Sequence, residues 1–192
     1  MPHFTPRRDW APLSEEEWAA LLPHLRDAAL PGRPLADPRG RMDAILHMAV
    51  ADLPWRLLPE RFGKPDTVSR HFRRLTHAGL WLRLLEALAD RRCPPGLRAI
   101  EYWLCRAARR AMRLLQMRGL VLARRLGLYT ALPMVPWMMP DPDLSEWLFR
   151  RIWRAIADIP RRWPPPGFLR VAGKVLVTAG GRPVWSKRFA PP

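Results

Sequence analysis

The sequence predicts a mainly α-helical protein, with a small helix-turn-helix-like bundle at the N-terminus followed by long basic amphipathic helices. Apolar residues recur at helical spacing in successive segments, and Pro or Gly residues separate these segments. A different pattern occurs near the C-terminus, where a turn at Gly180-Gly181 could join short strands in a β-hairpin. The candidate strands are Phe168–Val171, Lys174–Thr178 and Pro183–Phe189.

Local residues mark the ends of the helices expected in the first half of the chain. Ser14 is a candidate N-cap, and Glu17, three residues later, completes a capping box. Asp37 is a candidate N-cap for a helix with Pro at its first position, and Gly63 is suited to end a helix in the left-handed conformation. The first expected helix begins at Ser14 and continues through Leu25. The others occupy Pro38–Ala51, Pro54–Arg61, Pro65–His77 and Trp81–Leu88.

The distribution of charge divides the chain near Asp90. Residues 1–90 carry 13 basic and 12 acidic side chains, whereas residues 91–192 carry 20 basic and 5 acidic ones. We therefore expect a first domain at 1–90 and a basic, Arg-, Pro- and Trp-rich helical region of unknown role at 91–192. In the second region, long helices are expected from Leu97 to about Leu126 and over Asp143–Ile159.

The net charge of +16 indicates a polyanionic partner, for which nucleic acid and an anionic membrane surface are the usual candidates. No apolar stretch is long enough for a membrane-spanning helix, and the N-terminus lacks the apolar core of a signal peptide. Cys93 and Cys105 are expected to be free thiols in a cytoplasmic, nucleoid-associated protein. The five His residues form no metal-ligand spacing with them, so neither a metal nor another cofactor is expected.

Pro38–Ala51, Pro54–Arg61 and Pro65–His77 fit the order of a helix-turn-helix module, with the last as its recognition helix. If Val68, Phe72 and Leu75 face the core, the polar residues between them are left largely outside. Arg can bond to guanine through two hydrogen bonds, and Ser, Thr or Lys can reach a phosphate or a base edge. A basic face on a short helix is often only a solvated face. The DNA-contact candidates in and beside this helix are Lys64, Thr67, Ser69, Arg70, Arg73 and Arg74.

A series of ordered motifs supports the DNA-binding interpretation. It includes Leu13-Ser14-Glu15-Glu16-Glu17-Trp18, Gly32-Arg33-Pro34, Asp37-Pro38-Arg39, Asp43-Ala44-Ile45-Leu46, Pro54-Trp55-Arg56, Leu58-Pro59-Glu60-Arg61-Phe62-Gly63, Thr67-Val68, Phe72-Arg73-Arg74 and Gly79-Leu80-Trp81. From Leu13 to Leu88 the chain resembles the N-terminal domain of DDE-type insertion-sequence transposases. The resemblance implies a helical module that recognises the terminal repeats of a mobile element, and it adds Arg33, Arg39 and Arg56 to the DNA-contact candidates. Leu35 and Ala51-Asp52-Leu53 depart from the family pattern, and Asp52 weakens any phosphate contact there.

The catalytic domain of such transposases is expected to be absent. Its three acidic residues bind two metal ions, but beyond Asp90 the only acidic residues are Glu101, Asp141, Asp143, Glu146 and Asp158, and no alternating strand pattern surrounds them. The chain alone is therefore not expected to be an enzyme. Its expected partner is double-stranded DNA, together with a separately encoded catalytic subunit or a second copy in a homodimer.

Three hypotheses remain for residues 91–192. They could form a second DNA-contacting surface, they could lie on an anionic membrane as amphipathic helices, or they could be the product of a shifted reading frame in a decayed element. The sequence thus favours a truncated or regulatory transposase product that binds DNA. The alternative is an accessory protein that binds a membrane surface or a protein partner through its basic tail.

Overall fold

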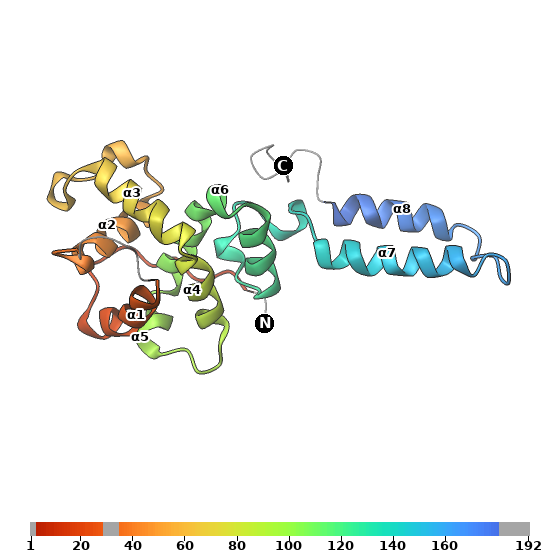
Figure 1. The fold of residues 1–192 in the computed structure, drawn as a ribbon, viewed down its shortest axis with the longest axis horizontal. Helices are drawn as coiled ribbons and strands as arrows, with labels where there is room; N and C mark the ends of the chain where they lie inside the picture. The colour runs from red at the N-terminus through yellow and green to blue at the C-terminus, as the bar shows by residue number, and fades with distance from the viewer. Residues whose placement is uncertain (1–2, 29–34, 181–192) are drawn as a thin grey trace. The chain divides into compact units, whose positions relative to one another are not determined.

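Figure 1 shows the computed structural model, which describes residues 3–28 and 35–180 of the 192-residue chain. The described residues form α-helices and short 3₁₀ turns and contain no β-strand, so the predicted mainly α fold is confirmed. The helices are α1 (Glu15–Asp27), α2 (Pro38–Ala51), α3 (Pro65–His77), α4 (Leu80–Ala89), α5 (Pro95–Ala99), α6 (Glu101–Arg125), α7 (Pro142–Ala157) and α8 (Phe168–Ala179). The 3₁₀ turns are η1 (Trp55–Leu57), η2 (Glu60–Phe62), η3 (Tyr129–Ala131) and η4 (Pro136–Met138).

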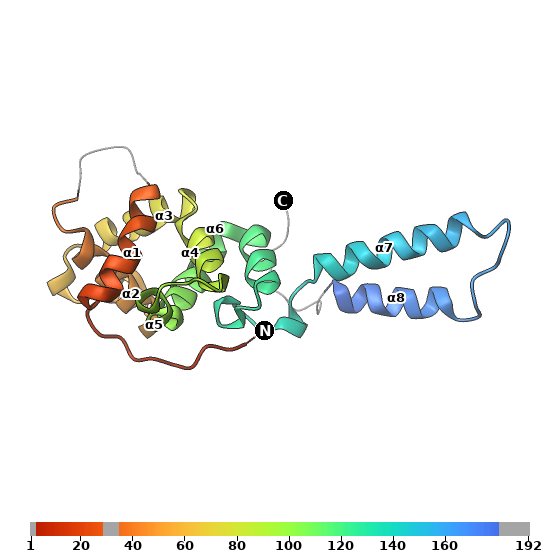
Figure 2. The same cartoon turned by 90° about the horizontal axis from the view of Figure 1, so that it is seen from below.

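The chain divides into two compact units, one before and one after the Pro133–Met134 bond. In the first unit α6 packs against α2, α3 and α4, while α1 packs against α5 (Figures 1 and 2). Ile100, Trp103 and Leu104, at the start of α6, are at most 1% exposed and belong to the same core as Trp81 and Leu85. The change in charge near Asp90 therefore falls inside a compact unit, and Pro95–Arg125 packs together with the N-terminal helices.

The predicted N-terminal caps form. Ser14 Oγ accepts a hydrogen bond from the backbone N–H of Glu17, whose carboxylate accepts one from the N–H of Ser14. Asp37 Oδ1 accepts from the N–H of Gly40 at 2.8 Å, with Pro38 at the first position of α2. These contacts satisfy N–H groups that have no partner within the helix.

The predicted helix over Pro54–Arg61 is wrong, because the structure has the two turns η1 and η2 in its place. Pro59 lacks an amide hydrogen, and it disfavours helical torsions in the residue before it. Leu58 accordingly is extended, with φ −63° and ψ 127°. Gly63 has the expected positive φ, 85°, but its ψ of −160° is not that of the left-handed helix.

The helix predicted from Leu97 to Leu126 is interrupted. The short α5 ends before Ile100, and α6 contains a break at Gln116, whose φ of 50° and ψ of −138° are not helical. Gly119 follows closely, and a Cβ at this glycine would lie 2.7 Å from Met112 Sδ and 2.8 Å from Leu115 Cβ. A glycine here thus lets the two sides of the break pack tightly.

The second unit contains the antiparallel helices α7 and α8. Leu148, Ala172 and Ala179 are buried where the two helices pack, and the N–H of Asp141 donates to the carbonyl of Ala179 at 2.7 Å. The predicted strands Phe168–Val171 and Lys174–Thr178 are wrong, because both segments belong to α8. Packing against α7 outweighs the strand preference of the valines. The third candidate strand, Pro183–Phe189, lies outside the described residues.

None of the helices in the described part of the chain is both long enough and apolar enough to cross a membrane.

Candidate nucleic-acid interface

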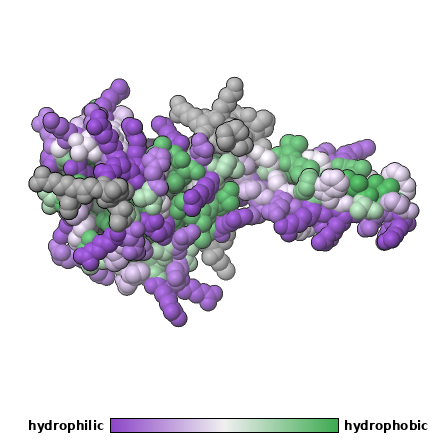
Figure 3. All heavy atoms as spheres, viewed as in Figure 1, coloured by the Kyte–Doolittle hydropathy of each residue, from purple (hydrophilic) through white to green (hydrophobic). Residues whose placement is uncertain are grey.

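Helix α3 presents a basic face to solvent. Lys64 immediately precedes the helix, and Thr67, Arg70, Arg73 and Arg74 are exposed along it. Hydrophilic side chains gather over the end of the first unit that carries α2 and α3 (Figure 3). Within the described ranges no ion pair joins Arg70 or Arg73 to an acidic side chain. Their guanidinium groups are therefore available to an anionic partner.

The opposite face of α3 is fixed in the core. Val68, Phe72 and Leu75 are at most 3% exposed, as the spacing predicts. The Phe72 ring lies between two indole rings, with its centroid 5.4 Å from that of Trp55 and 5.4 Å from that of Trp81. Because these contacts restrict rotation of the helix about its axis, the basic face has a defined direction.

Ser69 is the exception among the α3 candidates. The sequence pattern places it outside, but it is only 5% exposed and its hydroxyl donates to the carbonyl of Asp66 at 3.1 Å. The expected exposure is wrong because α2, α4 and α6 all pack against α3 and cover more of its circumference than one apolar stripe. A DNA contact from Ser69 would need this local bond to break.

The three DNA-contact candidates outside α3, which are Arg33, Arg39 and Arg56, differ in their surroundings. Arg56 is exposed in η1. Arg39 donates to the Glu15 carboxylate and to the carbonyl of Leu13, and so joins α2 to the start of α1. Arg33 lies outside the described residues. Arg39 therefore has a structural role already, whereas Arg56 is available for binding.

Two arginines of α6 contact the C-terminal end of α2. Arg106 Nε donates to the carbonyl of Ala49 at 3.3 Å, and Arg110 Nη1 donates to the carbonyl of Met48 at 3.2 Å. Carbonyls in the last turn of a helix lack intrahelical partners and carry partial negative charge, which a guanidinium group neutralises. These two arginines thus cap α2.

Further contacts hold the same arginines in place. Arg106 pairs with Asp52 at 3.1 Å, and its side chain is only 14% exposed. The guanidinium carbon of Arg110 lies 4.3 Å from the centroid of the Trp55 ring. Arg109, on the same turn, donates to the carbonyl of Pro133 at 3.0 Å. Burial lowers the pKa of both Arg109 and Arg110, although an arginine remains charged near neutrality.

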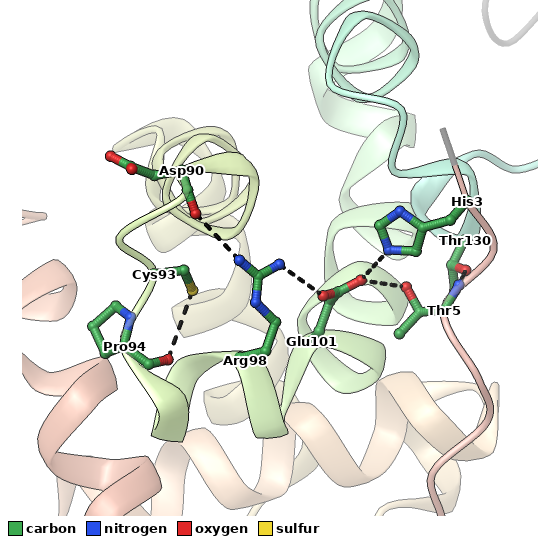
Figure 4. Close-up of polar contacts among 8 residues, drawn as sticks. All are labelled: His3, Thr5, Asp90, Cys93, Pro94, Arg98, Glu101 and Thr130. Atoms are coloured by element: carbon green, nitrogen blue, oxygen red, sulfur yellow. Dashed lines mark hydrogen bonds and ion pairs between the residues drawn. The ribbon is translucent and has the colours of Figure 1, made fainter. Parts of the chain in front are cut away.

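A buried carboxylate at the start of α6 fixes the N-terminal segment (Figure 4). Glu101 Oε1 lies 2.7 Å from His3 Nε2 and accepts a hydrogen bond from the Thr5 hydroxyl at 2.7 Å, while Oε2 lies 3.4 Å from Arg98 Nη1. Burial raises the pKa of this carboxyl, but the bonds from Thr5 and His3 outweigh burial and hold the pKa below its usual value. These contacts give Glu101 a structural role in holding the N-terminal segment against α6.

The two cysteines have weakly acidic thiols. Burial raises the pKa of Cys93 and raises that of Cys105 to about 12. Both are free thiols in the structure. Across residues 3–28 and 35–180, no three His, Cys, Asp or Glu side chains are grouped so that they could hold a metal ion.

Two cationic residues beside the C-terminal end of α3 are not among the candidates predicted from the sequence. Arg83 in α4 and Arg118 in α6 line one cavity with His77, the last residue of α3. Helical spacing cannot relate α4 to α6, and no sequence pattern marks the break at Gln116 that precedes Arg118. Only their positive charge could have drawn attention to them.

Comparison with known proteins identifies the N-terminal part of the chain. Residues 13–85 match the family model described as "Putative transposase of IS4/5 family (DUF4096)". The resemblance to insertion-sequence transposases is therefore confirmed for this segment, which includes α1 to α3 and most of α4. No curated protein and no solved structure matches the chain.

Proposed function

We propose that the chain binds double-stranded DNA through the exposed face of α3, as the DNA-recognition part of an insertion-element transposase. The observation that carries the proposal is the two-sided character of this helix. Its apolar side is held between Trp55 and Trp81, and its solvent side presents Arg70, Arg73 and Arg74. A rigidly held helix with arginines outward can enter the major groove and bond to base edges.

Sequence recognition is assigned to Arg70 and Arg73, and positioning to Lys64 and Thr67. Lys64 and Thr67 are exposed at the N-terminal end of α3, where the helix dipole favours a phosphate. Arg70 and Arg73 lie further along the exposed face and can each form a bidentate pair with guanine. Within this proposal the preferred DNA is the end of the mobile element.

The binding proposal is tested by fluorescence anisotropy with the full chain. Duplexes enriched from a random pool serve as probes, with an unselected duplex for comparison. Arg70→Ala and Arg73→Ala are each expected to weaken binding to the enriched duplex by about 5- to 150-fold, the range for loss of one good base contact. Affinity of the wild type should fall steeply with salt.

The matched control is Arg91→Ala, which removes the same charge from an exposed position between α4 and α5. It is expected to lower affinity for both duplexes slightly and equally. If Arg91→Ala matches Arg70→Ala, or if the wild type does not bind either duplex, recognition through α3 is refuted.

We further propose that the chain acts without strand-transfer chemistry of its own, as a truncated or regulatory product or with a separate catalytic subunit. The described acidic residues beyond Asp90 support this, because several have other roles. Glu101 holds the N-terminal segment, Asp141 Oδ1 accepts from the N–H of Leu144 at 3.0 Å, and Glu146 pairs with Arg150. The measurement is cleavage of an end-labelled enriched duplex with Mg²⁺ or Mn²⁺, where strand cutting would contradict the proposal.

One observation favours the alternative function of the tail. The hairpin of α7 and α8 exposes large apolar side chains next to basic ones, and Trp147, Trp153 and Trp163 are more than half exposed. Trp beside Arg is typical of helices that lie on anionic membranes. Co-sedimentation of the full chain with phosphatidylserine vesicles tests this alternative. If it holds, Trp153→Ser reduces sedimentation and Arg70→Ala does not.

A further inference from the structure

A cavity of about 600 Å³ opens beside the C-terminal end of α3, between α4 and the second half of α6. Helices α4 and α6 pack side by side along this region (Figures 1 and 2). The polar side chains that line the cavity are those of His77, Arg83, Glu86, Arg118 and Arg125. A site with three arginines and a single carboxylate favours an anionic ligand.

Arg83 has hydrogen-bonding capacity that the described part of the protein does not use. Its Nη1 donates to the carbonyl of Ala78 at 2.8 Å, which holds the guanidinium group against the end of α3. Its Nε and Nη2 are buried and have no hydrogen-bond partner within residues 3–28 and 35–180. A buried polar group without a partner costs about 1–3 kcal/mol, and more when it is charged. An anion held in the cavity beside this guanidinium group would offset part of that cost through its charge.

The break in α6 gives the cavity its second wall. Every residue of α6 that lines the cavity follows Gln116, where the backbone departs from helical torsions. Arg118 comes two residues after the break, is exposed, and has no ion-pair partner in the part of the chain that the structure describes. A continuous helix would direct this second half elsewhere, so the break is what brings Arg118 to the cavity that Arg83 also lines.

We infer that this cavity binds a phosphate group, and that Arg83 and Arg118 are its principal ligands. The guanidinium group is planar and can bond to two phosphate oxygens at once, which suits a cavity lined by arginines to a phosphate. His77 belongs both to the cavity and to α3, so the site continues the basic face of that helix. Resting on the proposed function, we assign the phosphate to the DNA backbone next to the bases that α3 reads.

A backbone contact has a different signature from a base contact. Arg118→Gln and Arg83→Gln are each expected to weaken binding of the full chain to enriched and unselected duplexes by the same factor. Each should also reduce the slope of log affinity against log salt by about 1. Arg70→Ala, in contrast, should affect mainly the enriched duplex.

The matched control is Arg92→Gln, an exposed arginine outside the cavity. It should leave the salt slope unchanged. Because Arg83 also bonds to Ala78, folding of Arg83→Gln is checked by circular dichroism, and Arg118→Gln tests the site independently of that bond. An unchanged salt slope in Arg118→Gln, or an equal change in Arg92→Gln, would overturn the assignment to DNA.

Free phosphate is a second source of the same chemistry and is tested separately. The melting temperature of the wild type is measured with inorganic phosphate or pyrophosphate against chloride at equal ionic strength. Stabilisation that Arg118→Gln abolishes, combined with no DNA binding by the wild type, would support the phosphate site and refute the proposed function. DNA binding by the wild type with no effect of either cavity variant would refute the site and leave α3 recognition standing.

Discussion

Arg110 allows a test that separates arginines that stabilise the fold from arginines proposed to bind DNA. Its Nη1 donates to the carbonyl of Met48 at 3.2 Å, and its guanidinium carbon lies 4.3 Å from the centre of the Trp55 ring. A hydrogen bond from a charged donor contributes about 1.5–3 kcal/mol, and a cation–π contact about 0.5–2 kcal/mol. Arg110→Met removes both contacts but keeps an apolar stem in place. We expect it to lower the free energy of unfolding by about 2 kcal/mol.

Arg110→Lys refines the test because it retains the positive charge. Lysine can still donate to a helix carbonyl, but it lacks the planar group that stacks on an indole ring. The expected loss is about 1 kcal/mol. The assay is urea unfolding followed by circular dichroism at constant m value, with DNA affinity measured on the same samples. DNA affinity of the folded Arg110→Lys protein should equal that of the wild type.

The matched control for these variants is Arg113→Met, which removes an exposed charge one turn further along α6. Its effect on stability should be within about 0.5 kcal/mol. If Arg110→Met and Arg113→Met change stability equally, Arg110 does not cap α2. If Arg110→Lys lowers DNA affinity while stability is unchanged, the residue belongs to the binding surface instead.

Two further predictions concern Gly119 in α6, with Gly173 in α8 as its control, and His71 in α3. Gly119→Ala should lower the free energy of unfolding by about 1–3 kcal/mol, because its Cβ would lie 2.8 Å from Leu115 Cβ. Gly173→Ala, with open space around its Cβ, should instead raise the free energy of unfolding by about 0.5–1 kcal/mol. If urea unfolding gives both changes the same sign, the packing at Gly119 is contradicted. Burial, followed by the charges of Arg41 and Arg74, lowers the pKa of His71 to about 4, so the unfolded chain, with a His pKa near 6.5, binds the proton first as the pH falls. Stability should therefore decrease from about pH 6.5 down to about pH 4, and thermal melts of His71→Gln should show a weaker dependence over this window.

Local residues were sufficient to predict the helices that define the candidate interface. The bounds of α2 and α3 are those expected from the sequence, since each begins at a proline and α2 also has the Asp37 cap. Contacts between distant segments decide what the sequence pattern misses. Ser69 is buried because three other helices pack around α3, and the direction of Arg110 depends on where α2 ends. Neither fact is encoded in neighbouring residues.

In the C-terminal unit, contacts between distant segments again decide the structure, and here they overturn the strands predicted from the local sequence. Val171, Val175 and Val177 favour strands when they are considered singly. The buried residues of this segment, Ala172 and Ala179, are instead separated by seven positions, a spacing typical of one face of a helix. The partner of that face is α7, and a pattern within α8 cannot reveal it.

Charge alone is a poor guide to the DNA-binding surface proposed for this protein. The second half of the chain holds most of the positive charge, yet Arg106, Arg109 and Arg110 donate to backbone carbonyls within the first unit. The first half is nearly neutral, but the arginines of α3 are directed to solvent. The net charge therefore combines groups that stabilise the fold with groups that can bind a polyanion, and only their contacts distinguish the two.

The same contacts bear on the hypothesis of a shifted reading frame. Residues Pro95–Arg125 lie beyond the transposase match, yet their apolar side chains complete the core of the matched helices and two of their arginines cap α2. A segment translated from a random frame would have no reason to supply both apolar residues for an existing core and cations at the end of an existing helix. The complementarity argues that α5 and α6 belong to the same folding unit as α1 to α4. It does not extend to α7 and α8, which bury few side chains and expose most of their aromatic ones.

A chain ending at Pro133 would therefore test whether the matched segment needs α6 but not the hairpin of α7 and α8. It should retain the helical content and the DNA affinity of the first unit, whereas a chain ending at Asp90 should lose its cooperative unfolding because Trp81 and Leu85 would lose their α6 neighbours.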